Sequence, residues 1–332
     1  MNSKLISAAL PLLGGLVLQG APTAVLAQTV KIDGSSTVFP ISEAVAEEFQ
    51  IANRKIRVTV GIGGTGGGFK KFCRGETDIS NASRPILKAE MDACAKAGIK
   101  YIELPIAYDA LTVVVNPKAT WVDQITVAEL KKMWEPAAQG SVTKWNQVNP
   151  KWPNAPLKLF GPGSDSGTFD YFTEAINGRS KSSRGDYNAS EDDNVLVQGV
   201  ETDPNAIAYF GYAYYAPNAA RMKALKVVNS KGAPVLPGEA AVLDGSYNPL
   251  ARPLFIYVNA ASASKPEVKA FVEFMLTSGA EYVKEVKYVP LAPAAYTTAL
   301  THFRGAKLGT VFAGVPSVGL KVEDLLKMEG KL

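Results

Sequence analysis

The sequence predicts an α/β fold built as two lobes. Short apolar, β-branched runs alternate with amphipathic segments along most of the chain, which is typical of α/β proteins. The chain has 332 residues, more than one small core usually organises, and this favours two domains. Two strongly β-prone runs, 107–115 and 252–258, flank an inserted stretch. We expect them to cross between the lobes as hinge strands.

The first lobe follows the alternation from its first residues. Residues 30–33 are predicted as a strand, and the helix after it carries a buried stripe of Ile41, Val45 and Phe49, with Pro40 in its first turn. The elements expected next are a strand at 56–60, a short helix with Phe69 and Phe72, a short strand at 78–80, a helix through Met91 and a long strand at 101–115.

Asn116-Pro117 breaks the pattern and begins the inserted lobe. We assign 28–115 and 251–332 to the first lobe and 116–250 to the second. The second lobe is predicted to contain helices at 127–134 and 168–176, strands at 157–160, 207–212 and 225–228, and a structured surface loop at 145–156. After the return, Pro266 starts a helix that Gly279 is expected to end.

Residues 1–27 have the pattern of a cleavable secretory signal peptide. Lys4 precedes an apolar run at 5–18, and Val25-Leu26-Ala27 supplies small residues at the cleavage site. The run is short and broken, which argues against the alternative of an uncleaved membrane anchor. We therefore expect the mature chain to begin at Gln28 and to be periplasmic.

The two cysteines, Cys73 and Cys94, are expected to form a disulfide, because exported chains mature in an oxidising compartment. The bond would close a loop of about 20 residues and contribute ~3 kcal/mol in the chain-entropy model. A reactive thiol pair is disfavoured by the wide spacing. The formal net charge of +4 is too small and too dispersed to indicate nucleic-acid binding.

Three Gly/Ser/Thr-rich turns, 34–37, 63–68 and 163–168, each lie between a predicted strand and a predicted helix. A helix start leaves backbone N–H groups without partners and carries the positive end of the helix dipole. Hydroxyls add donors, and glycines let the backbone approach a ligand, so such turns favour anions. Ordinary helix capping explains any single one equally well. Three of them, from both lobes, predict an anion in the cleft.

Arg84 is the expected source of positive charge. It follows the third predicted strand in Ser83-Arg84-Pro85, and ligands gather at strand ends in α/β sheets. Its planar guanidinium can donate two hydrogen bonds to a tetrahedral oxyanion. A surface ion pair is the alternative role.

Four segments, IDGSSTVFP (32–40), GTGGGF (64–69), ISNASRPI (79–86) and GPGSDSGTF (161–169), resemble the PstS-type family of phosphate-binding proteins, which serve the high-affinity phosphate ABC transporter. The similarity follows nearly the whole mature chain in order. It implies a type II-like, two-lobed periplasmic binding protein, monomeric and without cofactor or metal. Such a protein captures inorganic phosphate and delivers it to a membrane permease with its ATPase.

The resemblance also implies the binding residues. The anion is expected to contact the first helix start, the glycine turn, the end of the third strand and the second-lobe turn, through Ser36, Thr37, the Val38 amide, Thr65, Ser83, Arg84, Ser166, Gly167 and Thr168. Better-studied members have an Arg and an Asp where this chain has Pro162 and Ser83. The chain therefore resembles the subgroup in which the Arg comes from the first lobe.

Asp165 is the predicted determinant of selectivity. Phosphate near neutral pH carries a proton and sulfate does not, so a carboxylate acceptor in the site would admit phosphate and repel sulfate. Helix capping is the alternative role of Asp165. Sulfate, molybdate and tungstate remain open as other cargoes of the same scaffold.

Two other functions are disfavoured. Residues 61–66 match the dinucleotide pattern G-x-G-x-x-G, but the export signal and the extra glycines argue against a nucleotide. An exported hydrolase would need a histidine base beside Ser166, and His302 is the only histidine in the chain. Clustered metal ligands are also missing, and Glu191-Asp192-Asp193 is interpreted as a solvated loop.

Overall fold

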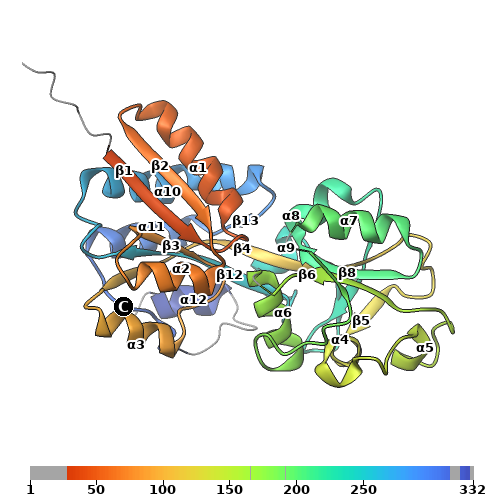
Figure 1. Ribbon diagram of the computed structural model, residues 1–332. Helices are drawn as coiled ribbons and strands as arrows, with labels where there is room; N and C mark the ends of the chain where they lie inside the picture. The colour runs from red at the N-terminus through yellow and green to blue at the C-terminus, as the bar shows by residue number, and fades with distance from the viewer. Residues whose placement is uncertain (1–27, 165, 191, 315–321, 330–332) are drawn as a thin grey trace, which may run out of the picture.

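The computed structural model describes residues 28–164, 166–190, 192–314 and 322–329. They form two lobes, with strand β4 (Tyr101–Val115) running between them (Figure 1). Among these residues there is no helix with the length and apolar character needed to cross a membrane. The predicted signal peptide, 1–27, lies outside the described residues.

The chain on either side of the inserted stretch builds the first lobe. Its elements are β1 (Gln28–Gly34), α1 (Phe39–Ala52), β2 (Ile56–Ile62), α2 (Thr65–Phe72), β3 (Ile79–Ala82), α3 (Lys88–Lys96), β12 (Ala251–Asn259), α10 (Pro266–Glu285), β13 (Val289–Pro290), α11 (Pro293–Arg304) and α12 (Val322–Glu329).

The stretch between β4 and β12 builds the second lobe. Its elements are β5 (Gln124–Thr126), α4 (Val127–Trp134), η1 (Pro136–Ala138), α5 (Trp145–Val148), β6 (Lys158–Pro162), α6 (Gly167–Asn177), β7 (Asn188–Ser190), α7 (Asp193–Thr202), β8 (Ala206–Gly211), α8 (Tyr212–Tyr215), η2 (Ala216–Asn218), β9 (Lys223–Ala224), β10 (Lys226–Val228), β11 (Pro234–Val235) and α9 (Glu239–Leu243).

One continuous sheet passes through both lobes in the order β2-β1-β3-β12-β4-β8-β6-β7. Strand β4 makes the connection, because residues 101–110 pair with β12 and residues 111–115 pair with β8, both antiparallel. Every residue of β4 is buried, as expected for a strand with apolar neighbours on both faces. The predicted two-lobed α/β fold is confirmed, with β4 paired in both lobes and β12 paired with β3 and with residues 101–110 of β4.

Helix α1 buries Ile41, Val45 and Phe49, as its periodicity predicts, and the Phe49 ring lies 5.4 Å from the Phe271 ring of α10. The prediction for α10 was wrong, because this helix continues past Gly279 to Glu285. Gly279 faces α1 instead, and a Cβ placed there would lie 3.8 Å from Val45 Cγ2. The glycine therefore lies inside the helix at its contact with α1 rather than at the helix end.

Two further details differ from the sequence prediction. Tyr212 begins α8 instead of ending β8. The stretch 145–156 contains the short helix α5, and its tryptophans Trp145 and Trp152 are buried with ring centroids 5.4 Å apart.

The predicted disulfide is present and joins Cys73, at the end of α2, to Cys94 in α3.

Candidate functional site between the lobes

The first predicted turn places Thr37 at the start of α1. The backbone leaves β1 through Gly34, whose φ is +141°, and a Cβ there would lie 2.2 Å from the Asn81 carbonyl oxygen. Only glycine permits so close an approach. The Ser35 N–H donates to that same oxygen, and Ser35 Oγ accepts the Thr37 N–H at 3.2 Å. The turn is thus fixed by the neighbouring strand.

Two glycines of the second turn, Gly63 and Gly68, and Gly61 at the end of β2 are closely packed. A Cβ at Gly61 or Gly63 would lie 2.4 Å from an oxygen of the Asp33 carboxylate. A Cβ at Gly68 would lie 2.5 Å from Gly34 Cα. Gly68 therefore lets α2 lie close against β1, and Gly61 and Gly63 leave room for the Asp33 carboxylate, so packing explains these three glycines without an anion.

Thr65, at the start of α2, is linked to the end of β3. Its Oγ1 accepts the Ser83 N–H at 3.2 Å and lies 3.1 Å from Ser83 Oγ. Both residues are buried. The structure therefore brings two of the predicted site residues into one hydroxyl pair.

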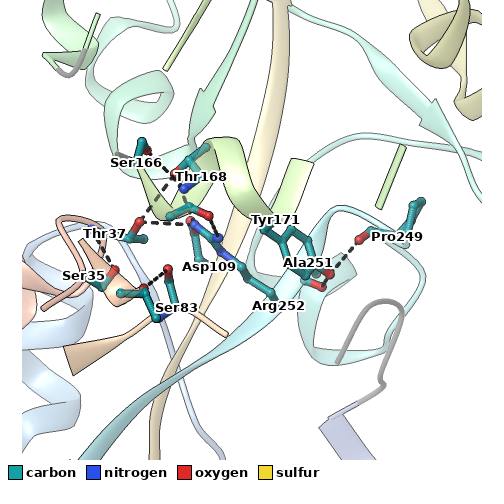
Figure 2. Close-up of polar contacts among 12 residues, drawn as sticks. Ser35, Thr37, Ser83, Asp109, Ser166, Thr168, Tyr171, Pro249, Ala251 and Arg252 are labelled. Carbon is teal, nitrogen blue, oxygen red and sulfur yellow. Dashed lines mark hydrogen bonds and ion pairs between the residues drawn. The ribbon is translucent and has the colours of Figure 1, made fainter. Parts of the chain in front are cut away.

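The second-lobe turn meets this pair across the cleft. Ser166 caps α6 by accepting the Thr168 N–H at 3.1 Å. A Cβ at Gly167 would lie 2.1 Å from Ser83 Oγ, so the two lobes are in direct contact here. Thr168 Oγ1 lies 3.5 Å from Thr37 Oγ1, and this contact joins the two lobes (Figure 2). Asp165 lies outside the described residues.

Arg252 of β12 holds the two lobes' turns together, and sequence reasoning missed it. Its side chain is 0% exposed. Nη1 donates to the Gly167 carbonyl oxygen at 2.6 Å, and Nη2 donates to Thr37 Oγ1 and Thr168 Oγ1 at 3.2 Å each (Figure 2). The guanidinium also lies over the Tyr171 ring, 5.1 Å from its centroid.

The charge of Arg252 is balanced by Asp109, its partner in the β4–β12 register. Asp109 Oδ2 accepts from Arg252 Nη2 at 2.9 Å and from Nε at 3.2 Å. A fully buried charge is stable only when it is paired and hydrogen-bonded in this way. The signal in the sequence was one acid and one base in two otherwise apolar runs that were both predicted as hinge strands.

Arg84 is held within its own lobe. Its two terminal nitrogens donate to both carboxylate oxygens of Glu90 at 2.9 and 2.8 Å. The guanidinium lies over the Phe69 ring at 5.8 Å, and Nη2 would be 3.6 Å from a Cβ at Gly66. Arg84 thus stands beside the glycine turn, but it is not among the residues that line the cavity described next.

A small cavity of about 30 Å³ lies between the lobes. The first lobe contributes hydroxyl groups from the α1 turn and the second lobe from the α6 turn; the lining residues are Ser36, Thr37, Ser166, Thr168, Asp193, Gly211, Tyr214 and Tyr288. Val38, whose amide was expected to contribute, is the N-cap of α1 and is fully buried. Donors from both lobes therefore face one enclosed space.

Asp193 gives this cavity a carboxylate. The prediction that Glu191-Asp192-Asp193 is only a solvated loop was wrong for Asp193, which begins α7 and lines the cavity. Burial, together with the charges of Asp109 and Asp193, raises the pKa of Tyr288. Its hydroxyl therefore stays protonated near neutral pH and can donate.

Two lobes on a shared hinge, with converging helix starts and hydroxyl groups between them, define a substrate-binding protein of the periplasmic type. The family model for the PBP superfamily domain matches residues 19–278. The chain belongs to this superfamily and, within it, to the PstS-type phosphate-binding proteins.

The chain is similar to two curated proteins and to a solved structure. Protein SphX of Synechococcus elongatus is 58% identical, covering 91% of this chain and 89% of its own length. The phosphate-binding protein PstS of Staphylococcus saprophyticus is 39% identical, covering 81% and 82%. The crystal structure of a possible phosphate binding protein from Planctomyces limnophilus has a TM-score of 0.70 and 48% identity, covering 85% of this chain and 99% of that one.

Proposed function

We propose that this chain captures inorganic phosphate in the periplasm and delivers it to the permease and ATPase of an ABC importer. One observation carries the proposal: hydroxyls of Thr37 in one lobe and Thr168 in the other meet on the guanidinium of Arg252, beside a cavity that both lobes line. The phosphate-binding name of the Staphylococcus relative supports phosphate as the cargo.

Binding in this site would be non-covalent and would need no cofactor. The starts of α1 and α6 present backbone N–H groups and the positive ends of their dipoles to the anion. Ser36, Thr37, Ser166 and Thr168 add hydroxyl donors. Arg252 is balanced by Asp109 and does not line the cavity, so it would orient the Thr37 and Thr168 hydroxyls towards the anion rather than contact the anion itself.

Closure would complete the site. We propose that the first lobe consists of residues 28–115 and 251–332 and the second of residues 116–250. The anion would first be held on one of these lobes. The second-lobe turn then closes on it and brings Gly167 against Ser83, as the contact in the structure suggests. Thr65 and Ser83 would support this turn, and Arg84 remains a proposed contact of the anion. The closed form, as a monomer, would dock on the permease.

Selectivity would come from a carboxylate in the site. Asp193 lines the cavity with the hydroxyl groups, and a carboxylate there can accept the proton that phosphate carries and sulfate lacks. Asp165 stays a proposed contributor at the α6 turn. Sulfate, molybdate and tungstate are the alternative cargoes, because the other donors suit any tetrahedral oxyanion.

A hydrolase is the less favoured alternative. Its triad would need a histidine next to Ser166, whereas His302 is buried in α11 and is not among the residues that line the cavity. Burial lowers the pKa of His302, which fits a packed side chain. Release of p-nitrophenol from its phosphate ester, lost in Ser166→Ala, would support the hydrolase instead.

The deciding experiment is titration calorimetry on protein stripped of endogenous ligand. We expect phosphate to bind at one site per chain and sulfate, molybdate and tungstate to compete poorly. Absence of phosphate binding would refute the proposal, and preference for another anion would identify that anion as the cargo.

The variant Arg84→Ala is tested in the same assay. A phosphate affinity unchanged within a few fold would show that Arg84 is not part of the site. Sequencing of the exported protein should give Gln28 as the first residue.

A further inference from the structure

Helix α6 carries a buried tyrosine that fastens it to the hinge. Tyr171 is 1% exposed, and its hydroxyl lies 2.9 Å from the Pro249 carbonyl oxygen and 2.8 Å from that of Ala251 (Figure 2). A phenol has one proton to donate, so the two carbonyl oxygens share it. Ala251 is the first residue of β12. Tyr171 therefore binds the backbone at the point where the chain enters the hinge strand.

The ring of Tyr171 makes a second contact with the same strand. Its centroid lies 5.1 Å from the Arg252 guanidinium, in the arrangement of a cation–π contact. That guanidinium donates to the Gly167 carbonyl oxygen at 2.6 Å and to Thr168 Oγ1 at 3.2 Å. Gly167 and Thr168 lie four and three positions before Tyr171, on the same face of the helix. The first turns of α6 are thus held on β12 by contacts one turn apart.

The placement of α6 decides where the donors of the second lobe lie. Ser166 and Thr168, at the helix start, line the cavity, whereas Tyr171 and Arg252 do not. Thr168 Oγ1 has one proton to donate, and Arg252 occupies one of its lone pairs, so the direction of that proton depends on where α6 sits. A donor that is free to move must be ordered when the anion binds, which costs affinity.

The same contacts relate this turn to the other lobe. Strand β12 pairs with β3 and with residues 101–110 of β4, so it belongs to the sheet of the first lobe. Arg252 Nη2, which donates to Thr168 Oγ1, also donates to Thr37 Oγ1 at 3.2 Å. Anchoring α6 on β12 therefore fixes the second-lobe hydroxyl relative to the first-lobe hydroxyl.

We propose that Tyr171 is a positioning residue of the anion site. Together with Arg252 it locks the start of α6 on β12, and the lock keeps the Thr168 hydroxyl opposite that of Thr37. The anion in this statement rests on the proposed function, while the lock itself does not. Tyr171 does not need to touch the ligand, because its loss acts through the placement of Ser166 and Thr168.

The test uses Tyr171→Phe, which removes the hydroxyl and keeps the ring beside Arg252. We expect titration calorimetry with inorganic phosphate to give about threefold to tenfold weaker binding. Tyr296→Phe is the matched control, because Tyr296 is also buried and its hydroxyl donates to a strand carbonyl oxygen, that of Ile106, at 2.7 Å. Both variants should lose stability in urea, but Tyr296→Phe should bind phosphate as the unmodified protein does.

Two results would overturn the proposal. If Tyr171→Phe lost stability but kept its phosphate affinity, Tyr171 would serve folding alone. If Tyr296→Phe lost as much affinity, the loss would follow from stability rather than from the placement of α6. Arg252→Lys keeps a positive charge beside Asp109 but lacks the fork that reaches several acceptors. It tests the lock from its other side if Tyr171→Phe does not fold; we expect about fivefold weaker binding or more, and unchanged affinity would overturn the proposal.

The lock can also be measured without phosphate. Hydrogen exchange of the ligand-free protein, followed by mass spectrometry, should be faster at residues 167–174 in Tyr171→Phe than in Tyr296→Phe, because the first turns of α6 open more readily. If the unmodified protein binds no phosphate, the proposed function fails alone and this difference should remain. Equal exchange of the segment in the two variants would refute the lock.

Discussion

Replacing Gly167 by alanine should prevent the lobes from closing while leaving each lobe folded. The added Cβ would lie 2.1 Å from Ser83 Oγ and 3.4 Å from Thr65 Oγ1. The first distance is far below van der Waals contact, and Ser83 Oγ cannot turn away without losing its 3.1 Å contact with Thr65 Oγ1. We expect a cost of about 1–3 kcal/mol, or roughly 5-fold to 150-fold weaker phosphate binding.

Titration calorimetry measures this loss, and thermal unfolding without ligand should stay close to that of the unmodified protein. Gly67→Ala is the matched control, because a Cβ at Gly67 meets nothing within 4 Å. The double variant Gly167→Ala/Ser83→Ala removes the clashing oxygen and should bind more tightly than Gly167→Ala alone. If Gly167→Ala bound phosphate as tightly as the unmodified protein, the lobes would not meet at this point in the bound state, and the reasoning would be wrong.

Three other predictions follow from the buried charges. Arg252→Ala should lower the free energy of unfolding in urea by about 3–5 kcal/mol, because it leaves Asp109 unpaired in the interior. Adding Asp109→Asn should recover most of the lost stability. Full stability of the Arg252→Ala single variant would contradict the prediction. Asp193→Asn should narrow the preference for phosphate over sulfate in competition calorimetry, and an unchanged ratio would exclude Asp193. Burial raises the pKa of Glu103 to about 7, so between pH ~4.5 and ~7 the unfolded chain ionises this group first and stability falls as the pH rises, by up to ~3 kcal/mol. Glu103→Gln should flatten that fall in urea unfolding followed across pH, and parallel curves would refute it.

The sequence predicted those helices and strands that can be recognised from the pattern of their own residues. The run 101–115 reads as one long strand because it is apolar on both faces, and α1 follows from the spacing of Ile41, Val45 and Phe49. The meeting of the α1 and α6 turns was also expected, because strand–turn–helix units share a chemistry that does not depend on distant contacts. Such patterns can be recognised one segment at a time.

What the sequence did not predict depends on partners far along the chain. Glycine is common at helix ends, but Gly279 lies inside α10, where it is buried against α1. The pairing of Arg252 with Asp109 requires the β4–β12 register. The sequence left two roles open for Arg84. Its bond to Glu90 shows the ion pair, and contact with an anion stays a prediction.

Strand β4 determines whether the two lobes unfold together. Residues 101–110 of the strand complete the ladder of the first lobe and residues 111–115 that of the second. Neither lobe can therefore lose its part of β4 without fraying the sheet edge of the other. We expect heat to melt both lobes in a single transition, with calorimetric and van't Hoff enthalpies in agreement. Two resolved transitions would mean that the lobes unfold independently, although residues 110 and 111 are joined in one strand.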